Sequence, residues 1–267
     1  MAITSLIIGE SGTGKTSSLR NFDTSEVKII QCFKKPLPFK NKGYDVSVCT
    51  RIDDLLLAIT TAKQDVIIVD DITYLMTIEF MNRLNEKSFD KFNDIANNIW
   101  RLVNTAIYTV NQNKRVYLIG HTDNSTDVVR LKTLGKLLDD KVNVEGMVTI
   151  VFRTCIRNKQ YCFTTRNNGA DTVKTPFDMF EEQYIENDLK AIDELIKNYY
   201  NITCDNIESE AISNVNNNNI DNNVNTKTSE TVKRNVRRNP RKKPNDISNL
   251  DLSKFDKMGQ NIPFDEL

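Results

Sequence analysis

The sequence has little histidine, and its cysteines are scattered. Among 267 residues there is one histidine, and the five cysteines are odd in number with no Cys-x-x-Cys spacing. A structural zinc site needs four closely placed Cys or His ligands, so we do not expect one here. Cysteines in this pattern are typical of reduced thiols, which favours a cytoplasmic protein.

Net charge and long apolar runs are also missing. The chain has 36 Lys and Arg against 36 Asp and Glu. This balance excludes a protein whose whole surface attracts nucleic acid, although it permits a local basic patch. No apolar run approaches the roughly 18–20 residues that span a bilayer. The first residues, MAITSLIIGESG, lack the basic lead and cleavage site of a signal peptide. We therefore expect neither secretion nor a membrane partner.

The composition changes near residue 203. Eight of the twelve residues 214–225 are Asn, and such a stretch cannot offset its chain entropy by burying apolar surface. Residues 233–243 then carry seven Lys or Arg and no acid, and the chain ends in the acidic tip NIPFDEL. We predict one folded domain over residues 1–203 and a disordered Asn-rich and basic tail over residues 204–267.

Within the domain, apolar patterns of two kinds alternate along the chain. Runs of apolar and β-branched residues predict strands, and apolar positions at helical spacing predict helices. The strands are expected at 3–8, 27–30, 46–49, 66–69, 116–119, 147–155 and 160–165, and the helices at 52–63, 92–107 and 185–199. This alternation predicts an α/β fold with a mostly parallel sheet flanked by helices.

The strongest motif is GESGTGKT at residues 9–16, which fits G-x-x-x-x-G-K-[ST]. It follows a predicted strand, and we expect a helix to start after it. Glycines let successive backbone N–H groups turn toward phosphates, and the helix N-terminus adds partial positive charge. Lys15 is predicted to neutralise the β- and γ-phosphates of ATP, and the Thr16 hydroxyl to ligate Mg²⁺. The predicted nucleotide-binding residues are Gly9, Glu10, Ser11, Gly12, Thr13, Gly14, Lys15, Thr16 and Ser17.

Polar residues follow two of the predicted strands. The run DVIIVDD ends in Asp70, which we predict to hold magnesium through a bound water, and Asp71, which could orient or deprotonate the attacking water. Asp71 could equally cap the segment ITYLM. His121 follows Ile119 and is expected to contact the γ-phosphate, or else to be a strand-end residue with its own partners.

The sequence resembles a known family over residues 1–200. The segments GESGTGKT, CFKKPLPFK, VIIVDDIT, VYLIGHTD, VKTPFDMF and YIENDLKAIDELIKNYY occur in the order seen in small RecA-like P-loop ATPases of bacteriophages. The resemblance implies a RecA-like core, ATP with Mg²⁺, self-association and single-stranded DNA as partner. It also implies a role in annealing or recombination in the cytoplasm of an infected host cell.

Two residue roles depend on this resemblance. RecA-like ATPases place ATP at a subunit interface, where a basic residue of the neighbour reaches the γ-phosphate. The resemblance gives this role to Lys174, with Arg166 behind it, although Lys174 could also be a solvated loop residue. The family also places a catalytic glutamate near the end of the second strand, but IIQCFKKPLPFK has no acid. Hydrolysis is therefore expected to be slow, or to use Asp71 instead.

Basic residues suggest where DNA could bind. Candidates near the later strands are Arg130, Lys132, Lys136, Lys141, Arg153, Arg157 and Lys159. They could track a nucleic-acid backbone, or form an ordinary charged surface. The basic run 233–243 is the stronger electrostatic candidate, the alternative being an inert linker. The tip NIPFDEL is similar to the tails by which single-strand-binding proteins recruit partners.

The sequence as a whole favours a DNA-stimulated ATPase that acts on single-stranded DNA in phage recombination, annealing or replication. One alternative is a P-loop kinase for a small molecule or nucleotide, which would need an arginine-rich lid. The other is a scaffold that binds ATP and DNA without turnover, which the missing glutamate favours.

Overall fold

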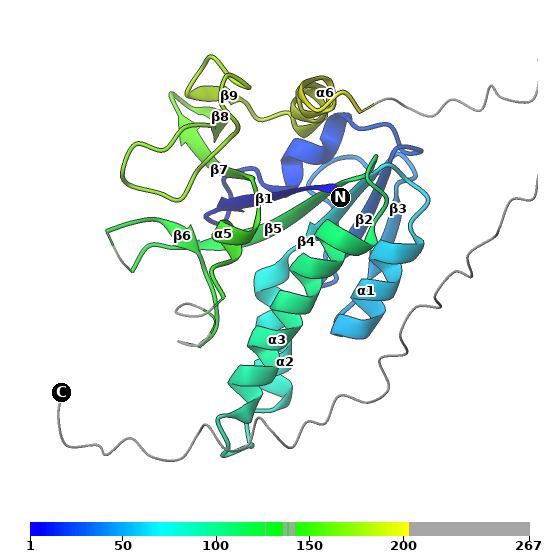
Figure 1. Cartoon of the computed structure of the whole chain (residues 1–267), viewed down its shortest axis with the longest axis vertical. Coiled ribbons are helices and arrows are strands. Elements are labelled where there is room, and N and C mark those ends of the chain that lie inside the picture. The colour runs from blue at the N-terminus through cyan, green and yellow to red at the C-terminus, as the bar shows by residue number, and fades with distance from the viewer. Residues whose placement is uncertain (126, 136–137, 139–141, 203–267) are drawn as a thin grey trace, which may run out of the picture. The chain divides into compact units, whose positions relative to one another are not determined.

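The computed structural model describes residues 1–125, 127–135, 138 and 142–202, and within them a nine-stranded sheet forms the centre of the domain (Figure 1). Neighbouring strands follow the order β3-β2-β4-β5-β1-β7-β8-β9, and β6 pairs with β5. The first six strands in this order are parallel, whereas β6, β8 and β9 pair antiparallel. The strands are β1 (Ile3–Gly9), β2 (Val27–Gln31), β3 (Asp45–Val48), β4 (Val66–Asp70), β5 (Arg115–Asp123), β6 (Arg130–Leu131), β7 (Ile150–Arg157), β8 (Gln160–Thr164) and β9 (Tyr184–Glu186).

Helices cover both faces of the sheet (Figure 1). One face packs against α1, α2 and α3, and the other against η1 and α6. Alternate residues of β4 point to opposite faces of the sheet: Ile67 and Val69 belong to the core on the first face, and Ile68 to the core on the second. All of β4 is therefore buried, as its continuous apolar run predicts. The helices are η1 (Thr16–Asn21), α1 (Ile52–Thr61), α2 (Ile72–Asn82), α3 (Asp90–Asn104), η2 (Thr105–Thr109), α5 (Val144–Met147) and α6 (Leu189–Tyr199).

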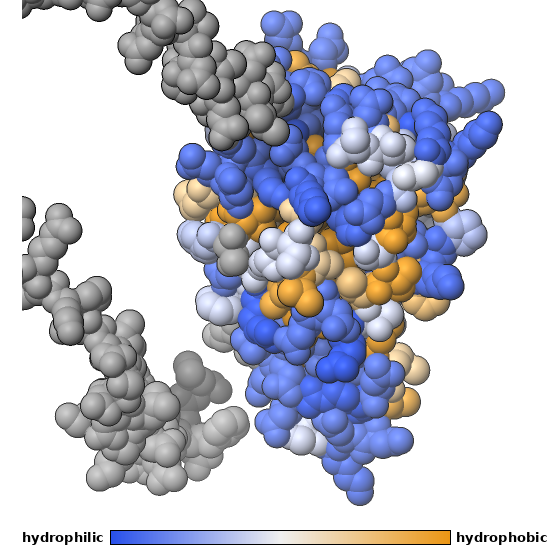
Figure 2. Space-filling model, turned by 90° about the vertical axis from the view of Figure 1, so that its right-hand side faces the viewer, coloured by the Kyte–Doolittle hydropathy of each residue, from blue (hydrophilic) through white to orange (hydrophobic). Residues whose placement is uncertain are grey.

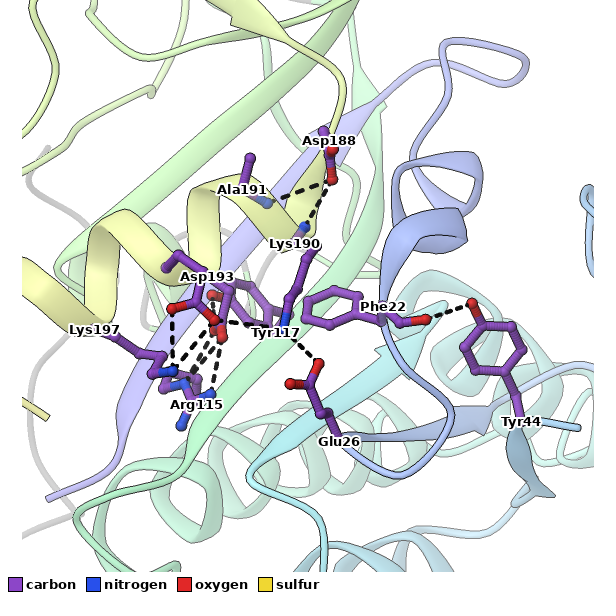
Figure 3. A network of polar contacts seen from close by, with 11 residues as sticks. Phe22, Glu26, Tyr44, Arg115, Tyr117, Asp188, Lys190, Ala191, Asp193 and Lys197 are labelled. Carbon is purple, nitrogen blue, oxygen red and sulfur yellow. Dashed lines mark hydrogen bonds and ion pairs between the residues drawn. The ribbon is translucent and has the colours of Figure 1, made fainter. Parts of the chain in front are cut away.

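Helix α6 is tied to the sheet by a buried ion pair (Figure 3). Arg115 Nη2 and Asp193 Oδ2 lie 2.8 Å apart, and the two side chains are 5% and 1% exposed. The hydroxyl of Tyr117 donates a second hydrogen bond to Asp193, at 2.7 Å. The N-terminus of α6 is capped by Asp188, which accepts from the backbone N of Lys190 at 3.0 Å. These contacts fix the end of the domain that follows β9.

The edge of the sheet at β3 carries exposed apolar side chains. Figure 2 views the molecule from the side of α1 and β3, and apolar residues gather across the middle of this face. Val48 of β3 is 44% exposed and Leu57 of α1 is 63% exposed. Strand β3 has only four residues, and a short edge strand offers little backbone for pairing with another chain.

The predicted α/β class with a mostly parallel sheet is confirmed, while several predicted elements differ. The helix expected after the phosphate loop is a six-residue 3₁₀ helix, η1. The hydroxyl of Ser18 donates to the carbonyl of Lys15 at 2.6 Å, and such a bond competes with the helical ladder. Ile185, expected in the last helix, lies in β9.

Among the residues that the structure describes, no helix is both long and apolar enough to cross a membrane. The Asn-rich segment, the basic run and the acidic tip of the predicted tail lie outside the described residues.

Candidate nucleotide-binding site

The phosphate loop begins where β1 ends, between β5 and β7. Gly9 pairs with His121 on one side and with Thr154 on the other. A Cβ at Gly9 would lie 2.0 Å from Thr154 Oγ1, so no larger residue fits there. Gly12 and Gly14 have φ of +80° and +95°, which glycine adopts without strain. The glycines of the motif are therefore required by the backbone that they form.

Lys15 is folded back into this loop. Its Nζ donates to the carbonyl of Gly9 at 2.8 Å and to that of Glu10 at 2.9 Å. Burial lowers the pKa of Lys15, and the nearby carboxylates of Asp71 and Asp70 oppose this effect. In the described part of the chain, no carboxylate forms an ion pair with Lys15. A buried cation bonded only to neutral groups fits a site for an anion.

Thr16, the first residue of η1, contacts Asp70, the last residue of β4. The hydroxyl of Thr16 donates to both carboxylate oxygens of Asp70, at 3.1 Å each. Burial raises the pKa of Asp70, while the charge of Lys35 opposes the shift. A hydroxyl and a carboxylate are hard oxygen ligands of the kind that Mg²⁺ prefers. These two residues therefore fit a magnesium site that the nucleotide's phosphates would complete. Among the described residues, no group of three or more His, Cys, Asp or Glu is placed to hold a metal.

Asp71 is buried and caps helix α2. Its Oδ1 accepts from the backbone N of Thr73 at 2.9 Å. Its Oδ2 makes no hydrogen bond, although His121 Nε2 lies 3.2 Å away. The peptide bond between Asp70 and Asp71 is cis. Burial raises the pKa of Asp71. The capping role is thus observed, and it leaves one carboxylate oxygen directed at the site.

His121 lies between Lys15 and Asp71. Its Nδ1 is 3.4 Å from Lys15 Nζ, and its ring meets Tyr74 edge-on with the centroids 5.6 Å apart. Burial, with the charge of Lys15, lowers the pKa of His121 to about 4. The imidazole is therefore neutral near pH 7, where it can accept or donate a hydrogen bond without adding charge.

Lys35 is a site residue that the sequence analysis missed. Its Nζ lies 3.6 Å from Asp70 Oδ2 and 5.8 Å from the centroid of the Tyr74 ring. Strand β2 pairs with β4, and Gln31 is the partner of Asp70. The residues after Gln31 therefore enter the site. The signal was present in CFKKPLPFK, because a lysine pair follows a strand whose neighbour ends in an acid.

The other predicted residues have varied surroundings. Thr13 Oγ1 hydrogen-bonds to Thr154 Oγ1 at 2.6 Å, and Glu10 accepts from the amide of Asn124 at 2.5 Å. Lys174 exchanges backbone hydrogen bonds with Val151, at 2.8 and 3.0 Å, and burial lowers its pKa. In the described residues, no contact joins the Lys174 side chain to the phosphate loop of its own chain.

Arg153 and Arg157, both basic DNA candidates, have partners within the domain. Arg153 lies 3.4 Å from Asp171, and the Arg157 guanidinium sits 4.2 Å from the Tyr184 ring centroid. Arg166, considered behind Lys174, donates to the carbonyl of Phe180 at 2.7 Å. Lys136, Lys141 and the run 233–243 lie outside the described residues.

Comparisons with known proteins do not assign this chain to a family. No protein-family model and no curated protein matches the chain. Among solved structures, the chain is similar to a KaiC-like protein from the hyperthermophilic archaeon Pyrococcus horikoshii OT3, at 12% identity and a TM-score of 0.39. The match covers 68% of this chain and 88% of that one. A TM-score below 0.5 does not establish a shared fold. The chain is therefore described by its own features, a mixed α/β domain with a phosphate-loop motif at the end of its first strand.

Proposed function

We propose that this protein binds ATP with Mg²⁺ and hydrolyses it on a RecA-like core. The observation that carries the proposal is the convergence of Lys15, Thr16 and Asp70. A glycine-rich loop presents a buried lysine, and the hydroxyl that follows it bonds to the acid at the end of β4. A loop with this motif and a carboxylate within hydrogen-bond distance of its Thr16 hydroxyl are the two halves of a nucleotide phosphate site.

Each residue has a role in this proposal. Lys15 would exchange its bonds to loop carbonyls for the β- and γ-phosphates, and Thr16 with Asp70 would hold Mg²⁺. The ion would neutralise charge on the phosphates. The unbonded Oδ2 of Asp71 would orient the attacking water, and neutral His121 would contact the γ-phosphate.

We further propose that the partner is single-stranded DNA and that the protein self-associates. This part is supported by the family resemblance and by the basic run 233–243, whose seven positive charges suit a nucleic-acid backbone. Lys174 would act on ATP held by a neighbouring subunit. The task would be phage recombination, annealing or replication in the infected cell, with single-strand-binding or other replication proteins as further partners.

ATP turnover with and without single-stranded DNA tests the proposal. The wild-type protein should hydrolyse ATP faster with DNA, and Lys15→Ala should abolish this by removing the phosphate contact. Asp71→Asn should retain ATP binding, because Asn also caps helices, but should lose turnover. DNA-stimulated turnover that persists in Lys15→Ala would refute the assignment.

One observation favours a second candidate, a scaffold that binds ATP and DNA without turnover. At the end of β2, where a catalytic acid was expected, Lys35 approaches Asp70 instead. A cation there holds the carboxylate but cannot accept a proton from water. ATP binding with no turnover, with or without DNA, would favour the scaffold.

A further inference from the structure

A second pocket lies beside the phosphate loop. Its volume is about 810 Å³, within the range of small-molecule sites. It is formed by η1, β8, β9 and the residue that follows β9. The lining includes Ser17, Arg20, Tyr161, Tyr184, Glu186 and Asn187.

The pocket adjoins the phosphate loop. Ser17 directly follows Thr16, whose hydroxyl bonds to Asp70. A Cβ placed on Gly14 would lie 3.0 Å from the Tyr161 ring and 3.1 Å from Asn187 Oδ1. A ligand whose phosphates lie on the loop would therefore have the pocket directly next to it.

Asn187 offers a hydrogen-bond donor that nothing in the described protein uses. Its side chain is buried, with the residue 2% exposed, and its Nδ2 has no hydrogen-bond partner. The backbone around it is fixed, because its N donates to Tyr161 O at 3.3 Å and its O accepts from Arg20 at 2.5 Å. A buried donor that lacks an acceptor is costly, so an acceptor supplied by a ligand would stabilise the site.

Two tyrosines give the pocket an aromatic lining. Tyr161 is 52% exposed, so its ring has surface available for contact. Tyr184 is partly buried and held by the Arg157 guanidinium. Aromatic rings stack on nucleic-acid bases with little dependence on base identity. An aromatic surface beside an unfilled amide donor suits a flat, heteroatom-rich ring carried on a sugar.

We propose that this pocket receives the base and ribose of the nucleotide bound at the phosphate loop. Tyr161 stacks on the base, and Asn187 Nδ2 donates to an acceptor of the nucleoside. The inference rests on the proposed ATP site and adds the part of the ligand that the loop motif does not specify.

The test compares ATP with inorganic tripolyphosphate, both with Mg²⁺, by isothermal titration calorimetry on the full chain. Wild-type protein should bind ATP at least about tenfold more tightly, because one stacked base adds that much. Tyr161→Ala and Asn187→Ala should each weaken ATP binding about tenfold and change tripolyphosphate binding less than twofold. Tyr108→Ala, which removes a tyrosine that is 68% exposed and lies outside the pocket, is the matched control.

The outcomes separate this inference from the proposed function. If wild-type protein binds ATP and tripolyphosphate with equal affinity, the inference alone is overturned. The same holds if properly folded variants lose affinity for both ligands equally. If wild-type protein binds neither ligand, the proposed ATP site fails and the inference fails with it. Thermal unfolding of each variant shows whether it is folded.

Discussion

At the scale of single residues, His121 couples the site to pH. Its imidazole lies near Lys15 and Asp71 and has a pKa of about 4, against about 6.5 in an unfolded chain. The folded protein therefore keeps this side chain neutral at a pH where the unfolded chain protonates it. The stabilisation is fully present above pH 6.5 and is lost as pH falls from 6.5 to 4.

This predicts that wild-type protein loses more stability on acidification than His121→Gln does. The difference between the two should be about 1–3 kcal/mol, allowing for partial solvent screening. Urea unfolding at several pH values from 7.5 to 4 measures it. The raised pKa values of Asp70 and Asp71 act in the opposite direction, and comparing the two proteins largely cancels their contribution. Parallel pH profiles would contradict the prediction.

The phosphate-loop residues and Asp70 could be predicted because their signals are contiguous in sequence. Lys35 was missed although the lysines of CFKKPLPFK are visible in the sequence, because their role appears only once β2 is known to lie next to β4. Asn187 was missed for a similar reason. Its amide matters only because the chain after β9 returns to Gly14, and no local spacing reveals such a return.

At the scale of elements, the attachment of α6 to β5 depends on a few buried polar groups. Asp193 accepts hydrogen bonds from Arg115 and from Tyr117 (Figure 3). Removing the carboxylate leaves a buried guanidinium without its partner. Helix α6 begins two residues after Asn187, so we expect the pocket beside the phosphate loop to depend on this attachment.

Asp193→Ala should lower the free energy of unfolding by about 3–5 kcal/mol. The double variant Arg115→Met with Asp193→Leu should recover part of this loss, because an apolar pair leaves no buried charge, although the Tyr117 hydroxyl still lacks its acceptor. Urea unfolding of wild type and both variants measures the effect. A loss below about 1 kcal/mol in Asp193→Ala would show that the ion pair does not hold α6.

Elements with a clear apolar period were predictable, and the others were not. Helix α3 places Ile95, Ile99 and Leu102 on one side, and these residues are buried as expected. Helix α2 reads ITYLMTIEFMN, with apolar residues on all sides, and therefore shows no stripe. Strand β9 has three residues and pairs with β8, so it is too short for a period to appear.

At the scale of the whole molecule, the proposed self-association gives Lys174 a role between subunits. Its side chain has no contact with the phosphate loop of the same chain within the described residues. A lysine that acts only on a neighbour's ATP can be supplied by a subunit whose own site is inactive.

Lys174→Ala and Lys15→Ala should therefore each lower ATP turnover at least about tenfold, and mixing them should restore part of it. In a mixed assembly, the Lys15→Ala subunit offers an intact Lys174 to the intact phosphate loop of its neighbour. ATPase assays of the two variants alone and at equal concentrations measure the recovery. No recovery on mixing, or full activity of Lys174→Ala alone, would exclude this role.

The position of β1 also has a consequence for synthesis on the ribosome. Strand β1 emerges first, yet its two partners emerge much later: Ile3 pairs with Arg115, and Ser5 pairs with Ile150. Long-range parallel pairing of this kind is slow to form. The loop at the end of β1 gains its Thr154 contact only after most of the domain has been translated. Nucleotide retention by a nascent chain would thus report that translation has passed β7, since no N-terminal fragment that ends before β7 contains both neighbours of β1.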